Sequence, residues 1–105
     1  MKLIDQALAF NKAYKIPNLN TPAVPSARMC VVRQMLIQKQ IDHLSNTWYS
    51  KDAGQMGMDI ALCIYTLAVT SCEFGVHKQL EENLDKIHKK YIENAAIRHS
   101  ELQSQ

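Results

Sequence analysis

Hydrophobic residues recur every three or four positions along most of this chain, and that spacing is the period of an α-helix. Alternation with period two, which would indicate β-strands, is missing from the sequence. Near the start, the pattern predicts an amphipathic helix that ends before Pro17, with an apolar stripe of Leu3, Ala7, Phe10 and Tyr14. Residues 16–26 contain all three prolines and predict an irregular loop.

Ser26 follows the last proline of this loop and is a candidate N-cap for a second helix that runs to about Trp48. Its apolar positions predict a buried stripe that includes Ile37, Ile41 and Leu44. Residues 49–53 are too short to form an element of their own and predict a tight connection, with Ser50 or Asp52 as the cap of the next helix.

The third predicted helix, about Ala53 to Phe74, is apolar nearly all round. Such a helix needs neighbours on several sides, so we expect it to be the most buried element. Gly75 follows it and suits the left-handed conformation that ends many helices. The residues of this helix expected to have little exposure are Ile60, Ile64, Leu67 and Ala68.

A fourth amphipathic helix is predicted from His77 to about Ser100, with a seam of Leu80, Leu84, Ile87 and Tyr91, of which Leu84 is expected in the core. The tail at about 99–105 is expected to fray. The predicted fold is therefore all-α, a four-helix bundle-like subunit formed by one domain of residues 1–105. The apolar surface of the third helix exceeds what three short amphipathic helices can cover, so we expect a homodimer.

Composition narrows the class of protein further. A net charge of +2, with basic residues dispersed among acids, does not favour nucleic-acid binding. Three cysteines and no recognisable signal peptide favour a reduced, cytoplasmic protein. Residues 54–72 are apolar, but Asp59 and several other polar residues interrupt them, so we interpret them as a core helix and not as a membrane span.

Candidate chemistry lies on the second and third helices. Gln38 and Asp42 are four residues apart and share a face, with Lys39 beside them. Asp59 is the one charged residue between Asp52 and Glu73, and a lone carboxylate in so apolar a helix is costly to bury without a partner. Gln38, Lys39, Asp42 and Asp59 are therefore the predicted ligand pocket, although Asp42 and Asp59 also fit ordinary helix-surface and helix-dipole roles.

Several short strings occur in a fixed order: Ile16-Pro17, Thr21-Pro22, the segment 36–42, then Asp59 with Leu62, Gly75-Val76 and finally His88-Lys89-Lys90. In this order they resemble the all-α nucleotide pyrophosphohydrolase superfamily, in particular its MazG-like and phosphoribosyl-ATP-pyrophosphohydrolase-like members, over about residues 8–92. That family carries a Glu-Glu-x-x-Glu motif, whose acidic positions fall here on Gln38, Lys39 and Asp42. Its later Glu-x-x-Asp motif falls on Asp59 and Leu62.

The resemblance implies a magnesium-dependent hydrolase of nucleotides, but this chain keeps two of the family's acids, Asp42 and Asp59, as weak candidate metal ligands. Lys39 would repel a metal, because a unit charge at 4 Å is worth about 4 kcal/mol at an effective dielectric of 20. We therefore expect a catalytically degenerate homologue that needs no cofactor and binds a nucleotide or another phosphorylated molecule. Two alternatives stay open. One is a helical protein-interaction module, and the other is an active pyrophosphohydrolase whose magnesium site is rearranged around Asp42, Asp59 and acids such as Glu73 or Glu81.

Overall fold

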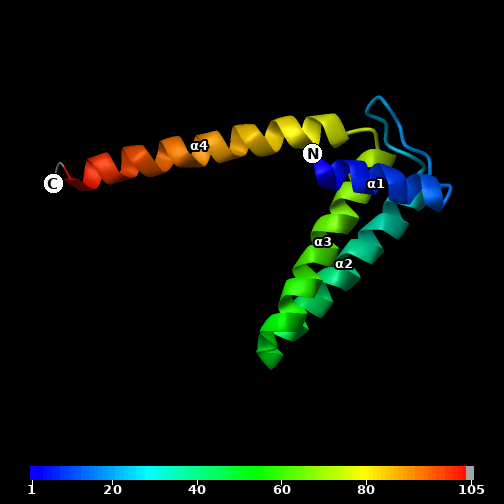
Figure 1. Cartoon of the computed structure of the whole chain (residues 1–105), viewed down its shortest axis with the longest axis horizontal. Helices are drawn as coiled ribbons and strands as arrows, with labels where there is room; N and C mark the ends of the chain where they lie inside the picture. Colours follow the sequence, from blue (N-terminus) through cyan, green and yellow to red (C-terminus); the bar gives the residue numbers. More distant parts are fainter. Residues whose placement is uncertain (104–105) are drawn as a thin grey trace.

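The structure, a computed structural model, describes residues 1–103 and contains four helices and no strand in that range (Figure 1). The helices are α1 (Lys2–Ala13), α2 (Ala27–Ser50), α3 (Ala53–Glu73) and α4 (His77–Gln103). The all-α prediction is confirmed. Helix α4 continues past its predicted end at about Ser100, so residues 99–103 of the tail expected to fray are helical. Residues 104–105 of that tail lie outside the described residues.

Two polar side chains fix where the central helices begin. The hydroxyl of Ser26 accepts a hydrogen bond from the Met29 backbone N–H at 3.3 Å, so Ser26 is the N-cap of α2 as predicted. The carboxylate of Asp52 accepts from the Gln55 N–H at 3.1 Å and caps α3. The two caps leave only Lys51 and Asp52 between the helices, and α2 and α3 therefore form an antiparallel hairpin.

Gly75 makes the turn between α3 and α4 possible. Its φ of 71° lies in the left-handed region that residues with a Cβ rarely adopt. A Cβ at this position would lie 2.1 Å from the carbonyl oxygen of Thr21, in the loop that precedes α2. The turn and the loop therefore pack too closely for any side chain.

Gly75→Ala is expected to destabilise the fold by at least about 1–3 kcal/mol, because it adds backbone strain and a contact with Thr21 that neither backbone can relieve locally. A thermal melt followed by circular dichroism measures this effect. Gly57→Ala is the matched control, since an added Cβ there meets nothing within 4 Å. An unchanged midpoint for Gly75→Ala would contradict the turn geometry.

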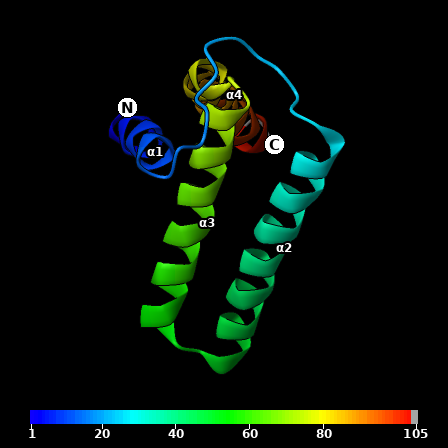
Figure 2. The same ribbon diagram turned by 90° about the vertical axis from the view of Figure 1, so that its right-hand side faces the viewer.

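The hydrophobic core is small and lies where α1 crosses the C-terminal half of α3 (Figure 2). It consists of Ile4, Ala7, Ala68, Val69 and Cys72, with Phe10, Tyr65 and Leu80 packed around it. A buried polar residue ties the same elements together. The Asn11 amide donates to the Val69 carbonyl at 3.2 Å and to the Asn18 side chain at 2.8 Å, which holds the start of the loop against α1.

The predicted core is only partly correct for the single chain. Ala68 is buried and Ile37 and Leu44 are half-buried, but Ile60, Ile64 and Leu67 are 40%, 48% and 51% exposed. Ile41 and Leu84 are also exposed. The reason is that α1 and α2 cover two sides of α3, while α4 leaves the other helices after its first turns and covers no third side (Figure 1).

The direction of α4 makes the molecule extended. Its radius of gyration is 17.5 Å, against about 13 Å for a compact domain of this length. The accessible surface is 8121 Å², whereas a compact monomer of 12.0 kDa exposes about 6,000 Å². Each chain therefore exposes about 2,000 Å² more than a compact monomer of its size.

Helix α3 is long and apolar enough to cross a membrane, by length and composition only. This is weak support for a span, because the core helix of a soluble protein passes the same test.

Candidate functional site

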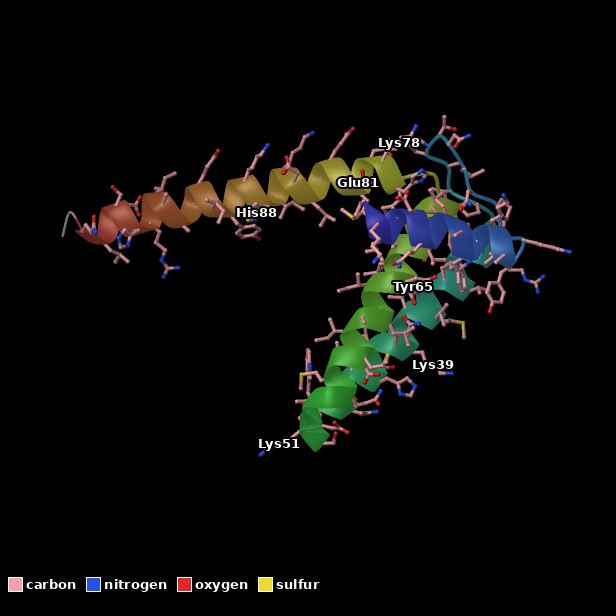
Figure 3. The ribbon with its side chains drawn as sticks, in the orientation of Figure 1. Lys39, Lys51, Tyr65, Lys78, Glu81 and His88 are labelled. Carbon is pink, nitrogen blue, oxygen red and sulfur yellow. The ribbon has the colours of Figure 1, made fainter. Side chains whose placement is uncertain are left out.

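Three of the four predicted site residues lie together on α2. Gln38, Lys39 and Asp42 line one open depression of about 470 Å³, together with Val31, Gln34 and Met35. The Gln38 amide donates a hydrogen bond of 3.0 Å to the Asp42 carboxylate. All of the lining belongs to α2, and Lys39 lies on the side of that helix away from α4 (Figure 3). The depression is therefore a feature of a single helix surface.

Asp59 lies elsewhere, in the seam between α2 and α3, where it is only 8% exposed. Its carboxylate accepts hydrogen bonds from the Thr47 hydroxyl at 2.6 Å and from the Gln55 amide at 2.9 Å. The hydrogen bond from Thr47 has the largest effect on the pKa of Asp59 and lowers it, and the bond from Gln55 lowers it further. Desolvation opposes this shift, while the nearby charge of His43 adds to it. Asp59 is therefore an ionised group that ties the two helices together, and neither hydrogen bond involves Asp42.

The other carboxylates considered for a rearranged metal site also have partners. Glu73 forms an ion pair with Arg33 across α2 and α3, with 2.5 Å between Oε2 and Nη2, and both side chains are almost fully buried. Glu81 pairs with the amino group of Met1 at 3.0 Å. Within residues 1–103, no three side chains of His, Cys, Asp or Glu gather closely enough to hold a metal ion.

A second depression lies between α1, α2 and α3. Its volume is about 210 Å³, and its lining is Phe10, Arg33, Leu36, Gln40, Leu62, Tyr65, Thr66 and Val69. The Phe10 and Tyr65 rings meet edge to face there, with centroids 5.6 Å apart. Two of the lining residues carry a buried atom without a hydrogen-bond partner among the described residues, Nε of Arg33 and Oε1 of Gln40. Unpaired buried polar atoms are uncommon and are available to a ligand.

Gln40 is not among the site residues that the sequence predicts. It lies one or two positions from Lys39, Gln38 and Asp42, and each position on a helix rotates a side chain by about 100°. The signal that identifies the side of α2 facing α3 is the helical spacing of the half-buried and buried residues. Six of the eight share this spacing: Cys30, Arg33, Ile37, Gln40, Leu44 and Thr47, while Met29 and Ser45 are the other two.

Comparisons of the chain with protein-family models, with curated proteins and with solved structures find no match. The resemblance to nucleotide pyrophosphohydrolases therefore rests on the residues quoted above.

Proposed function

We propose that the chain is a catalytically inactive, MazG-like homodimeric protein that binds a nucleotide-type ligand without hydrolysing it. The observation that carries the proposal is the environment of Asp59. In the resemblance, this residue belongs to a cluster of metal-binding acids, whereas here its carboxylate is occupied by Thr47 and Gln55. A carboxylate held by two neutral donors, with no second acid in its contacts, favours a structural role over metal binding.

The depression between α1, α2 and α3 is the preferred place for the ligand. Its volume of about 210 Å³ is below the range of about 300–1,000 Å³ typical of whole drug-sized ligands, so it suits a single ring system. Aromatic rings line it, while Arg33 Nε offers a donor and Gln40 Oε1 an acceptor. A heterocycle that carries both an acceptor and a donor, such as a nucleobase, matches these groups.

A thermal-shift screen with nucleosides and nucleotides, each with and without magnesium, tests this function. We expect at least one base to raise the melting temperature equally with and without magnesium, because binding to the folded state stabilises it by mass action. Ligand at 100 times its Kd adds about 2.7 kcal/mol. Gln40→Leu should abolish the shift, since it removes the buried acceptor while it keeps a similar volume.

Gln38→Leu is the matched control, because Gln38 lies on the same helix outside that depression. It should leave the shift unchanged. A shift that requires magnesium, or that is lost in Gln38→Leu and kept in Gln40→Leu, would contradict the proposed site and favour the open depression on α2.

A protein-interaction module is the second candidate function. The observation in its favour is the total accessible surface, about 2,000 Å² beyond that of a compact monomer, together with the many large apolar side chains that are exposed on it. No shift with any nucleoside or nucleotide would favour this candidate over ligand binding.

A further inference from the structure

The exposed apolar residues of α3 form a continuous stripe. Ile60, Ile64 and Leu67 are spaced by four and three positions and so share one face of the helix. The α1 side of α3 carries Tyr65, Ala68, Val69 and Cys72, and the α2 side carries Asp59 and Glu73. The stripe is thus the third side of α3, which we call the free stripe.

Helix α4 presents a second apolar face toward the same space. His88 points to the inner side of the angle between α4 and α3 (Figure 3). Leu84 and Tyr91 lie four and three positions from His88 and therefore share its face, and Ile87 lies next to them. Leu84 and Tyr91, 47% and 69% exposed, therefore lie on the inner side of the angle, and Ile87, 50% exposed, flanks them on the helix. We call the space between this face and the free stripe the α3–α4 corner.

An unpartnered α4 would not be stable by itself. Beyond its first turns, every residue from Glu82 to Gln103 is exposed. Most helical stability in proteins comes from packing of an apolar face, because isolated helices are marginal in water. The straight course of α4 into solvent therefore implies a protein surface along its inner face.

We propose that the α3–α4 corner holds the α2–α3 hairpin of a second copy of this chain, related by a two-fold axis beside Ile64. This inference rests on the proposed homodimer and specifies how it is built. The two copies of α3 pack antiparallel, so that Ile60 contacts the partner's Leu67 and each Ile64 lies near its counterpart. The free stripe is self-complementary in this arrangement, because its apolar residues are distributed about evenly around its middle.

The geometry of α4 fits the same arrangement. The register that pairs Ile60 with Leu67 also places the partner's Ala53 opposite Phe74, so the tip of the partner's hairpin reaches the start of α4. Packed helices lie about 8–10 Å apart, and α4 rises about 1.5 Å per residue. The partner's α3 would therefore contact α4 about seven residues from its start, close to Leu84. The partner's α2 would contact it about fourteen residues from its start, close to Tyr91. The exposed tip residues Trp48 and Tyr49 would be covered by α4.

The area to be covered agrees with a stable dimer. Each chain exposes about 2,000 Å² beyond a compact monomer, so two chains could bury about 4,000 Å² in total. Obligate homodimers bury about 2,000–5,000 Å² in total. A partner hairpin covers both the free stripe and the inner face of α4. A single helix packed along one of these two faces would leave the other exposed.

A different two-fold contact could form through α4 alone. Glu81, Glu82 and Asp85 precede Lys86, Lys89 and Lys90, so two antiparallel copies of α4 would place opposite charges against each other. That contact leaves the free stripe of α3 in water. The two arrangements therefore differ in their dependence on Ile64 and on the α4 charges.

Light scattering at micromolar concentration tests the proposal. We expect a mass of 24 kDa for the wild type, twice the 12.0 kDa of the chain. Ile64→Glu and Ile87→Glu should each raise the dimer Kd at least about 100-fold, because each places a charge in an apolar contact. Ile87 touches no part of its own chain's core, so Ile87→Glu cannot act by unfolding the subunit.

Met58→Glu is the matched control, since Met58 is 64% exposed on α3 but lies at least about 120° around the helix from Ile64 and Leu67. It should stay dimeric, as should Glu82→Lys. A wild-type mass of 12 kDa would overturn the homodimer itself. A dimer that survives Ile64→Glu and is lost in Glu82→Lys would overturn the corner arrangement and leave the homodimer standing.

Discussion

Replacing Glu73 with glutamine should destabilise the protein by about 3–5 kcal/mol, the usual cost of leaving a buried charge without its partner. The side chains of Glu73 and Arg33 are only 7% and 12% exposed, and their ion pair joins α2 to α3. The free energy of unfolding of a small domain is about 5–15 kcal/mol, so this single change removes a large part of the stability. Urea unfolding followed by circular dichroism measures the loss.

The double variant Arg33→Met with Glu73→Leu is the informative control. It removes both charges and fills the space with apolar atoms, so most of the stability lost in Glu73→Gln should return. Asp85→Asn breaks a pair with Lys89 in which both side chains are more than 60% exposed, and it should change stability little. A stable Glu73→Gln variant would show that Arg33 finds water or another acceptor.

The helices could be predicted from the sequence because local rules determine them. Ser26 and Asp52 follow the preferences for N-caps, and Gly75 follows the preference for a left-handed helix end. The direction of α4 could not be predicted, because periodicity identifies an apolar face but not the element that covers it. Leu84 was expected inside a four-helix bundle for this reason and is exposed in the single chain.

The candidate site shows a different limit of the sequence. Gln38, Lys39 and Asp42 do lie together, as their spacing of three and four positions requires. The packing of the hairpin decides which of two adjacent faces of α2 lies toward α3. A short degenerate motif can be aligned with the sequence one residue away from the correct register, and one residue changes the direction of a side chain by about 100°. Gln40 and Asp59 lie on or near the seam, whereas Lys39 lies on the outer surface.

Restoring acids should therefore create magnesium binding only when they are placed on the seam. The resemblance directs attention to Gln38→Glu, Lys39→Glu and Leu62→Asp. We call those three substitutions the outer set. The structure favours a different set, Gln40→Glu, His43→Glu and Leu62→Asp, which we call the seam set. Gln40 and Leu62 line one depression, and the charge of His43 lowers the pKa of Asp59. We expect the seam set to bind magnesium at least about tenfold more tightly than the outer set.

The physical reason is the charge that the ion meets. Each carboxylate within about 4 Å contributes up to about 4 kcal/mol at an effective dielectric of 20, and the seam set adds its acids to Asp59. Without magnesium, the same acids repel one another, so the seam set should also be less stable at neutral pH. Calorimetric titration with magnesium chloride measures binding, and a pyrophosphate-release assay measures hydrolysis. The wild type should release no pyrophosphate above the uncatalysed rate. Hydrolysis by the wild type that is lost in Asp59→Asn would refute the inactive assignment, and tighter binding by the outer set would show that Lys39 and Gln38 face the site after all.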